Sequence, residues 1–213
     1  MIRLFLDIET LPGDESLKQQ IEGQITPPGN ISRPERIEQW MQDERSQEVE
    51  KRYRATSLRG HAGRILCIGY LKETPQDVVE GVLTGDEADI LRDFWTLAED
   101  VDLFVGFNVL DFDLKFIVQR SIILGVRPGM DISFNRFRND QVYDVMVEWD
   151  MGGRERISLD NLARAMVIES PKGDIDGSQV YDYFLAGRLQ EIYDYCLRDV
   201  RATAEIYRRM NFM

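Results

Sequence analysis

The segment that most constrains the fold is residues 2–9, IRLFLDIE. Its first residues are apolar on both faces, which is typical of a strand in the middle of a sheet. Because side chains alternate along a strand, Asp7 and Glu9 share one face and lie about 6–7 Å apart. Two neighbouring carboxylates at the end of a buried strand repel each other unless a cation joins them. The pattern is weak by itself, because 38 of the 213 residues are acidic and a solvated strand end explains it equally well.

The elements that follow indicate an α/β fold. Short apolar runs predict strands at 64–71, 78–84 and 102–107, and a further short strand at about 143–147. Apolar residues at helical spacing predict helices over 86–99, 112–124, 159–167, 179–186 and 188–210, with a break at Gly187. This order of elements predicts a central mixed five-stranded sheet flanked by helices.

One insert interrupts this order. We expect a single domain over 1–213 with a charged, partly helical insert at about 12–62. The first part of the insert is rich in Pro and Gly and is predicted to be a loop. Residues 34–54 are predicted to form a highly charged helical stretch that packs on the edge of the domain.

Asp199 lies on the apolar stripe of the predicted C-terminal helix. Burying an unpaired carboxylate is costly, so this side chain requires a cation or hydrogen-bond donors. Tyr195 lies one turn earlier, which places its hydroxyl on the same side of the helix as the Asp199 carboxylate. The simpler alternative is an ordinary helix in which Asp199 pairs with Arg120, Arg164 or Thr203.

The segment 106–113, GFNVLDFD, lies at a predicted strand-to-helix junction. Asp111 is predicted to cap the helix that follows. Asp113 shares its helix face with apolar residues and is predicted to turn inward, where it would require a cation. The pattern does not decide which of these two acids is functional. Asn108 suits a hydrogen bond either to a ligand or to the backbone of the loop.

Together, three separated elements supply four inward-facing acids, an arrangement that suits two Mg²⁺ or Mn²⁺ ions. The net charge of −12 argues against a passive nucleic-acid binder. It does not exclude an enzyme that reaches an anionic substrate through bound cations, because the metal ions reverse the local field. No apolar run is long enough to span a membrane, and neither a signal peptide nor a disulfide framework is indicated, so we expect a cytoplasmic protein.

In this order, the motifs Asp7-x-Glu9, Asn108-x-x-x-Phe112-Asp113 and Tyr195-x-x-x-Asp199 resemble those of the DEDD-type 3′–5′ exonucleases, tyrosine subgroup. These enzymes have a ribonuclease H-like fold. The chain is most similar in pattern to the proofreading exonuclease domain of family B DNA polymerases, and Tyr195-Cys196-Leu197-Arg198-Asp199 carries that likeness. The resemblance covers nearly the whole chain and selects Asp113 over Asp111.

The resemblance implies a metal-dependent 3′–5′ exonuclease that acts on single-stranded nucleic acid, with DNA favoured, and releases 5′-nucleoside monophosphates. It implies that Asp7 bridges two metal ions, that Glu9 and Asp199 complete the site that activates water, and that Asp113 holds the second ion. Tyr195 would orient the attacking water. The terminal nucleotide would contact Thr10, Leu11, Asn108 and Phe112. The alternatives are an enzyme specific for RNA and a catalytically idle nuclease fold that serves as a binding module.

Four other features have simpler interpretations. Cys67 and Cys196 are expected to be small buried residues. His61 lies in an Arg-Gly-His-Ala-Gly turn and is expected to be structural or exposed. The segment 172–177 is expected to be a polar loop that could touch phosphate through Lys172, because it lacks the third acidic position and the closing Glu of a calcium loop. Asp144 is equally consistent with a surface acid and with a residue that supports the site.

Overall fold

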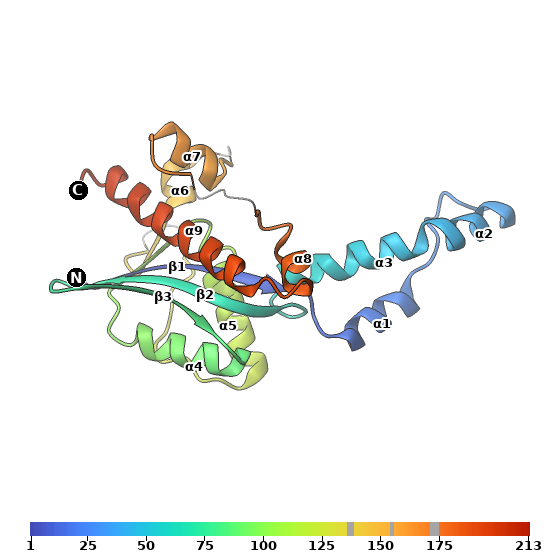
Figure 1. Ribbon diagram of the computed structural model, residues 1–213, viewed down its shortest axis with the longest axis horizontal. Helices are drawn as coiled ribbons and strands as arrows, with labels where there is room; N and C mark the ends of the chain where they lie inside the picture. The colour runs from blue at the N-terminus through green and yellow to red at the C-terminus, as the bar shows by residue number, and fades with distance from the viewer. Residues whose placement is uncertain (136–138, 154–155, 171–174) are drawn as a thin grey trace.

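Five strands form one sheet at the centre of the computed structural model, which describes residues 1–135, 139–153, 156–170 and 175–213 (Figure 1). The strands are β1 (Arg3–Leu11), β2 (Arg64–Glu73), β3 (Val78–Thr84), β4 (Leu103–Gly106) and β5 (Val142–Asp144), in the order β3-β2-β1-β4-β5. β1 is antiparallel to β2 and parallel to β4. The expected mixed five-stranded sheet, with the first strand at its centre, is confirmed.

Alternate residues of β1 face two separate parts of the core. Leu4, Leu6 and Ile8 pack with α4 (Glu87–Ala98) and α5 (Asp113–Leu124). Phe5 faces the other way and packs with α7 (Leu159–Ala165) and α9 (Leu189–Met210). Because side chains alternate along a strand, Asp7 and Glu9 continue the face of Phe5 and therefore lie on the side that α9 covers.

The strand predicted at 143–147 is shorter than expected. The structure has β5 only over Val142–Asp144, and α6 (Val145–Asp150) begins directly after it. The strand ends at Asp144 because this residue caps α6. Its carboxylate accepts hydrogen bonds from the backbone N–H groups of Met146 and Val147.

The predicted cap of α5 is also wrong. The helix begins at Asp113, so Phe112 and not Asp111 occupies the N-cap position, and no side chain caps this end. By contrast, the predicted break at Gly187 is confirmed. This glycine adopts φ 72° between α8 (Val180–Leu185) and α9, a left-handed conformation that favours glycine.

The insert forms a helical arm that projects from one end of the sheet (Figure 1). Its helices are α1 (Glu15–Gln24), α2 (Pro34–Asp43), α3 (Arg45–Arg54) and the 3₁₀ turn η1 (Ala55–Leu58). The predicted charged helical stretch is thus two consecutive helices, and α1 occupies part of the predicted loop. Helical periodicity missed α1 because none of its residues is buried, although Asp14 caps its first turn by accepting from the Leu17 N–H.

Two hydrogen bonds tie the arm to the end of β1. The Tyr53 hydroxyl donates to the Gly13 carbonyl over 2.9 Å, and the Thr10 hydroxyl donates to the Ser57 carbonyl over 2.8 Å. The arm also has a small core of its own around Ile25, Trp40 and Val49. Among the helices of the described residues, none combines the length and the hydrophobicity needed to span a bilayer.

Candidate active site

The downstream half of β1 is open on the side of β4. The two strands pair only where Arg3–Phe5 lies beside Leu103–Val105, because β4 is short and ends at Gly106. The N-terminus of α5 fills the space beyond, and its first residue, Asp113, accepts a hydrogen bond from the Ile8 N–H over 3.0 Å. Asp113 is only 3% exposed, so the prediction that it turns inward is confirmed.

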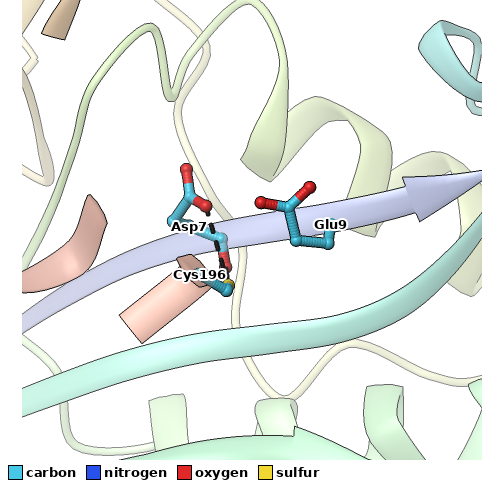
Figure 2. A group of neighbouring side chains, drawn as sticks. All are labelled: Asp7, Glu9 and Cys196. Carbon is cyan, nitrogen blue, oxygen red and sulfur yellow. Dashed lines mark hydrogen bonds between the residues drawn. The ribbon is translucent and has the colours of Figure 1, made fainter. Parts of the chain in front are cut away.

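Asp7 and Glu9 lie side by side on the open part of β1, with Cys196 of α9 next to Asp7 (Figure 2). One ligand atom from each of these three residues lies within 4.8 Å of the other two. The α9 helix approaches β1 this closely because Gly69, which stands opposite Asp7 on β2, has no side chain. A Cβ at this position would lie 2.8 Å from the Cys196 sulfur.

Asp199 brings a further carboxylate to this region from α9. Its Oδ1 atom is buried and has no hydrogen-bond partner among the described residues, and Tyr195 one turn earlier lowers the pKa of the carboxylate. The arginines considered as partners are engaged elsewhere, since Arg120 pairs with Glu87 and Arg164 pairs with Asp160. Pairing with these arginines therefore does not explain the buried carboxylate.

Burial and mutual repulsion make these acids hard to ionise without a counter-ion. Burial raises the pKa of Asp7 well above its usual range, and Asp113, Asp199 and Glu9 raise it further. Burial is likewise the main cause of the raised pKa values of Glu9 and Asp113, and it raises the pKa of Asp199 to about 6. Asp113 and Asp199 thus lie close enough to raise the pKa values of both β1 acids, although among the described residues the ligand atoms within 4.8 Å of one another are those of Asp7, Glu9 and Cys196.

The chemistry of this cluster fits divalent metal ions. In the described part of the chain, no salt bridge joins Asp7, Glu9 or Asp113 to a lysine or arginine. These three carboxylates, together with the orphaned buried oxygen of Asp199, supply the hard oxygen ligands that Mg²⁺ and Mn²⁺ prefer. A bound cation would attract these carboxylates and so lower their pKa values.

The sequence left two interpretations of Asp144 open, a surface acid and a residue that supports the site. Asp144 is 2% exposed, so the interpretation as a surface acid is wrong. Besides capping α6, its carboxylate accepts from the Asn108 N–H over 3.0 Å and from the Leu110 N–H over 3.1 Å. Asp144 therefore holds the loop that leads from β4 to Asp113, including Asn108 at φ 62°. The position of an acid just before a helical run was the available signal.

The residues predicted to contact substrate lie next to the proposed ligands in sequence, just after Glu9 or shortly before Asp113. Leu11 is 2% exposed and packs against α8 and α9, in the same apolar group as Tyr195. Phe112 packs on Phe116, with ring centroids 5.6 Å apart, and the Thr10 hydroxyl bonds the Ser57 carbonyl. The substrate contacts of Thr10, Leu11, Asn108 and Phe112 stay predictions.

The remaining predictions have simple outcomes. Cys67 and Cys196 are free and buried, as expected, and His61 is exposed. The loop predicted at 172–177 lies partly outside the described residues, which include Ile175, Asp176 and Gly177 but not Lys172.

The sheet and its flanking helices define an α/β protein with a ribonuclease H-like fold. The structure resembles that of the family B DNA polymerase from the hyperthermophilic archaeon Pyrobaculum calidifontis, with a TM-score of 0.63 and 18% sequence identity. That likeness covers 99% of this chain and 24% of the polymerase chain. In sequence, the chain is 28% identical over 134 residues to a DNA polymerase of Archaeoglobus fulgidus, which covers 56% of this chain and 17% of the polymerase.

A family model matches residues 56–213 and is described as a predicted 3′–5′ exonuclease related to the exonuclease domain of PolB. The chain belongs to this family, which places it among the exonucleases, in the hydrolase class. The matched segment contains Asp113, Tyr195 and Asp199, whereas Asp7 and Glu9 lie before it on β1. The structure brings this strand to the matched segment through the Ile8 to Asp113 hydrogen bond.

Proposed function

We propose that the chain hydrolyses the terminal phosphodiester of single-stranded nucleic acid from the 3′ end, with DNA favoured, and releases 5′-nucleoside monophosphates. The observation that carries this proposal is that α5 and α9 bring acids to the β1 pair: Asp113 bonds the N–H of Ile8, between Asp7 and Glu9, and Asp199 of α9 has one buried oxygen without a partner among the described residues. Membership of an exonuclease family supports the same reaction class.

Two divalent ions, Mg²⁺ or Mn²⁺, would be held by Asp7, Glu9, Asp113 and Asp199. When bound, such ions lower the pKa of water and neutralise charge that develops on the phosphate. These ligands lie on the rigid elements β1, α5 and α9, which would hold them in fixed positions relative to the reacting phosphate. This assignment of individual ligands rests on the resemblance and on the cluster of raised pKa values.

Tyr195 would act as a hydrogen-bond donor to the attacking water. Burial raises its pKa, and the neighbouring Asp199, Glu9 and Asp7 carboxylates raise it further. The phenol therefore keeps its proton at neutral pH and can donate a hydrogen bond, but it cannot serve as a general base. Tyr195 also lies close enough to Asp199 to lower the pKa of that carboxyl.

A groove beside the end of β1 would hold the strand. It has a volume of 920 Å³ and lies between α1 and the turn that joins η1 to β2. Although the whole chain carries a net charge of −12, four arginines and the only histidine line this groove: Arg52, Arg59, Arg64, Arg120 and His61. Arg120 and Arg52 are paired with glutamates, whereas Arg59 is exposed and forms no ion pair with the described residues. Charge complementarity favours a phosphodiester backbone as the occupant.

The decisive experiment follows a 5′-labelled DNA strand and a matched RNA strand in Mg²⁺ or Mn²⁺. Stepwise shortening from the 3′ end, with release of 5′-monophosphates, is the expected result, and DNA should be shortened faster. Asp7→Asn should abolish it, because Asp7 is the proposed ligand of both ions. If a pure, folded preparation left both strands intact in either metal, the proposal would be wrong.

The other outcomes are equally definite. Faster digestion of RNA would keep the chemistry and identify a ribonuclease. Failure to bind Mn²⁺ in calorimetry would identify a catalytically idle nuclease fold.

A further inference from the structure

We propose that Asp7, Glu9 and Cys196 form a binding site for a thiophilic divalent cation, Zn²⁺, which overlaps the proposed Mg²⁺ site. Two carboxylates and a thiol lie in one group, in which Glu9 and Cys196 are buried and Asp7 is half-buried, and two of these residues are also the proposed ligands for hydrolysis. Occupation by Zn²⁺ would therefore exclude Mg²⁺ and stop turnover. The inference does not require that the chain cleaves nucleic acid.

The distances suit a tetrahedral metal ion. With Zn–S near 2.3 Å and Zn–O near 2.0 Å, sulfur and oxygen ligands on one ion stand about 3.5 Å apart. The Cys196 sulfur already lies 3.6 Å from Oδ2 of Asp7, and the Glu9 carboxylate completes a group whose ligand atoms all lie within 4.8 Å (Figure 2). Small rotations of the Glu9 side chain would close the remaining gap, and water would take the fourth position.

The backbone fixes the thiol in this place. Cys196 is fully buried, and its sulfur also contacts the Asp7 carbonyl oxygen at 3.4 Å. The sulfur fits beside β2 because Gly69 has no side chain. A Cβ at Gly69 would lie only 2.8 Å from the Cys196 sulfur. The thiol is thus held under the carboxylates by β1, β2 and α9, and not by a mobile loop.

Glu9 supplies the independent observation that a ligand is missing. The residue is only 7% exposed, and it accepts no hydrogen bond from the described residues. A buried carboxylate without donors is costly. Its neighbours are other acids and Cys67, which stands opposite it on β2, and all of them disfavour its charge.

The chemistry of the donor set distinguishes Zn²⁺ from Mg²⁺. Thiolate is a soft ligand that Zn²⁺ and Cd²⁺ accept, whereas Mg²⁺ and Mn²⁺ favour carboxylate and water oxygens. The same pair of carboxylates would therefore bind Mg²⁺ without the thiol and Zn²⁺ with it. Binding of Zn²⁺ displaces the thiol proton, so the sulfur becomes a charged ligand only in the zinc complex.

Direct spectroscopy of the wild-type protein tests the site without relying on turnover. The protein loaded with one equivalent of Zn²⁺ is expected to show one sulfur neighbour at about 2.3 Å and oxygen neighbours at about 2.0 Å in zinc-edge X-ray absorption. With Cd²⁺ in place of Zn²⁺, a thiolate-to-metal absorption band should appear in the ultraviolet and saturate at one equivalent. A zinc environment with oxygen and nitrogen neighbours alone would overturn the proposal.

Two matched cysteine variants locate the sulfur. Changing even an outer partner of a metal ligand costs about 10- to 100-fold in affinity, so Cys196→Ser should weaken Zn²⁺ binding at least about 100-fold and abolish the Cd²⁺ band. Cys67→Ser is the control, because Cys67 is equally buried on neighbouring β2 but lies outside the group of three ligands. Persistence of the band in Cys196→Ser would contradict the assignment.

Discussion

The backbone N–H of Ile8 donates a hydrogen bond to Oδ1 of Asp113 over 3.0 Å, across 105 residues of sequence. The donor is free because β4 stops pairing with β1 at Phe5. Asp113 thus takes the place of a sheet neighbour and positions the first turn of α5 beside the carboxylates of β1. The same bond connects the strand that precedes the matched family segment to the helix within it.

The two roles of Asp113 can be separated by substitution. Asp113→Asn keeps an oxygen that can accept from the Ile8 N–H and removes a buried negative charge, so we expect it to fold with at least wild-type stability in the absence of metal. Asp113→Ala leaves the buried N–H unsatisfied and should be less stable than Asp113→Asn by about 1–3 kcal/mol. Denaturant unfolding measures the difference, and equal stability of the two variants would refute this account. Both variants should lose hydrolysis.

Asp199 should make the metal-free protein less stable as the pH rises. Burial raises its pKa in the folded protein to about 6, from 3.8. A raised pKa favours the folded state fully below pH 4, and this contribution is lost as the pH rises through 6. The shift corresponds to about 2–3 kcal/mol. The isosteric variant Asp199→Asn should lack this loss.

Thermal unfolding of both proteins at pH 5 and pH 7.5, with a metal chelator present, tests this prediction. The wild type should lose more stability than Asp199→Asn over this interval. Saturating Mn²⁺ at pH 7.5 should stabilise the wild type and leave the variant much less affected. Parallel pH profiles for the two proteins would show that Asp199 is not responsible.

Tyr195 should matter for turnover and not for metal binding. Tyr195→Phe removes the hydroxyl near Asp199 and keeps the ring. We expect kcat to fall roughly 10- to 100-fold, at the lower end of what positioned proton-handling groups contribute. Affinity for Mn²⁺ should change little, because a protonated phenol is a poor ligand. Tyr193→Phe, on the same helix, is the control and should keep full activity.

The sequence predicts the central strand and the inward acids well, because their signals are local. Periodicity alone predicts an apolar strand that ends in Asp7 and Glu9. It also predicts that Asp199 lies on the apolar stripe of the C-terminal helix. The choice of Asp113 over Asp111 needed the family resemblance, since the register of a helix start depends on tertiary contacts. The bond from the Ile8 N–H to Asp113 supplies that contact and joins segments far apart in the chain.

Periodic patterns in the sequence do not predict features that depend on hydrogen bonds between side chains and the backbone. Asp144 serves two segments at once through four backbone N–H groups, and no periodic pattern encodes this. Helix α1 has no buried face, so its formation rests on its Asp14 cap and not on an apolar stripe. The closeness of Cys196 to Asp7 requires the absent side chain of Gly69 on a third element.

Asp144 should contribute strongly to stability and to the position of Asp113. Asp144→Ala leaves four backbone N–H groups without their acceptor, and we expect a loss of at least about 3 kcal/mol. Asp144→Asn keeps one accepting oxygen and should be intermediate. Asp140→Asn, an exposed acid four residues earlier, is the control and should behave as wild type. Wild-type stability of Asp144→Ala would rule out its role in holding the loop.

Arg59 should contribute to strand affinity through its charge. It is exposed in the groove beside the end of β1 and forms no ion pair with the described residues, so Arg59→Gln removes one positive charge without breaking a salt bridge. Each phosphate contact to a single strand contributes about 0.7 to the slope of log affinity against log salt. We therefore expect weaker binding at low salt and a salt dependence that is shallower by about this amount.

Fluorescence anisotropy with a labelled single strand, in Ca²⁺ to limit cleavage, gives both quantities. Arg127→Gln removes an equally exposed arginine that follows the far end of α5 and lies outside the groove, so its affinity and salt slope should match the wild type. Equal weakening by the two substitutions would mean that net charge alone governs binding. A selective effect of Arg59→Gln would place the strand in the groove between α1 and the turn that joins η1 to β2.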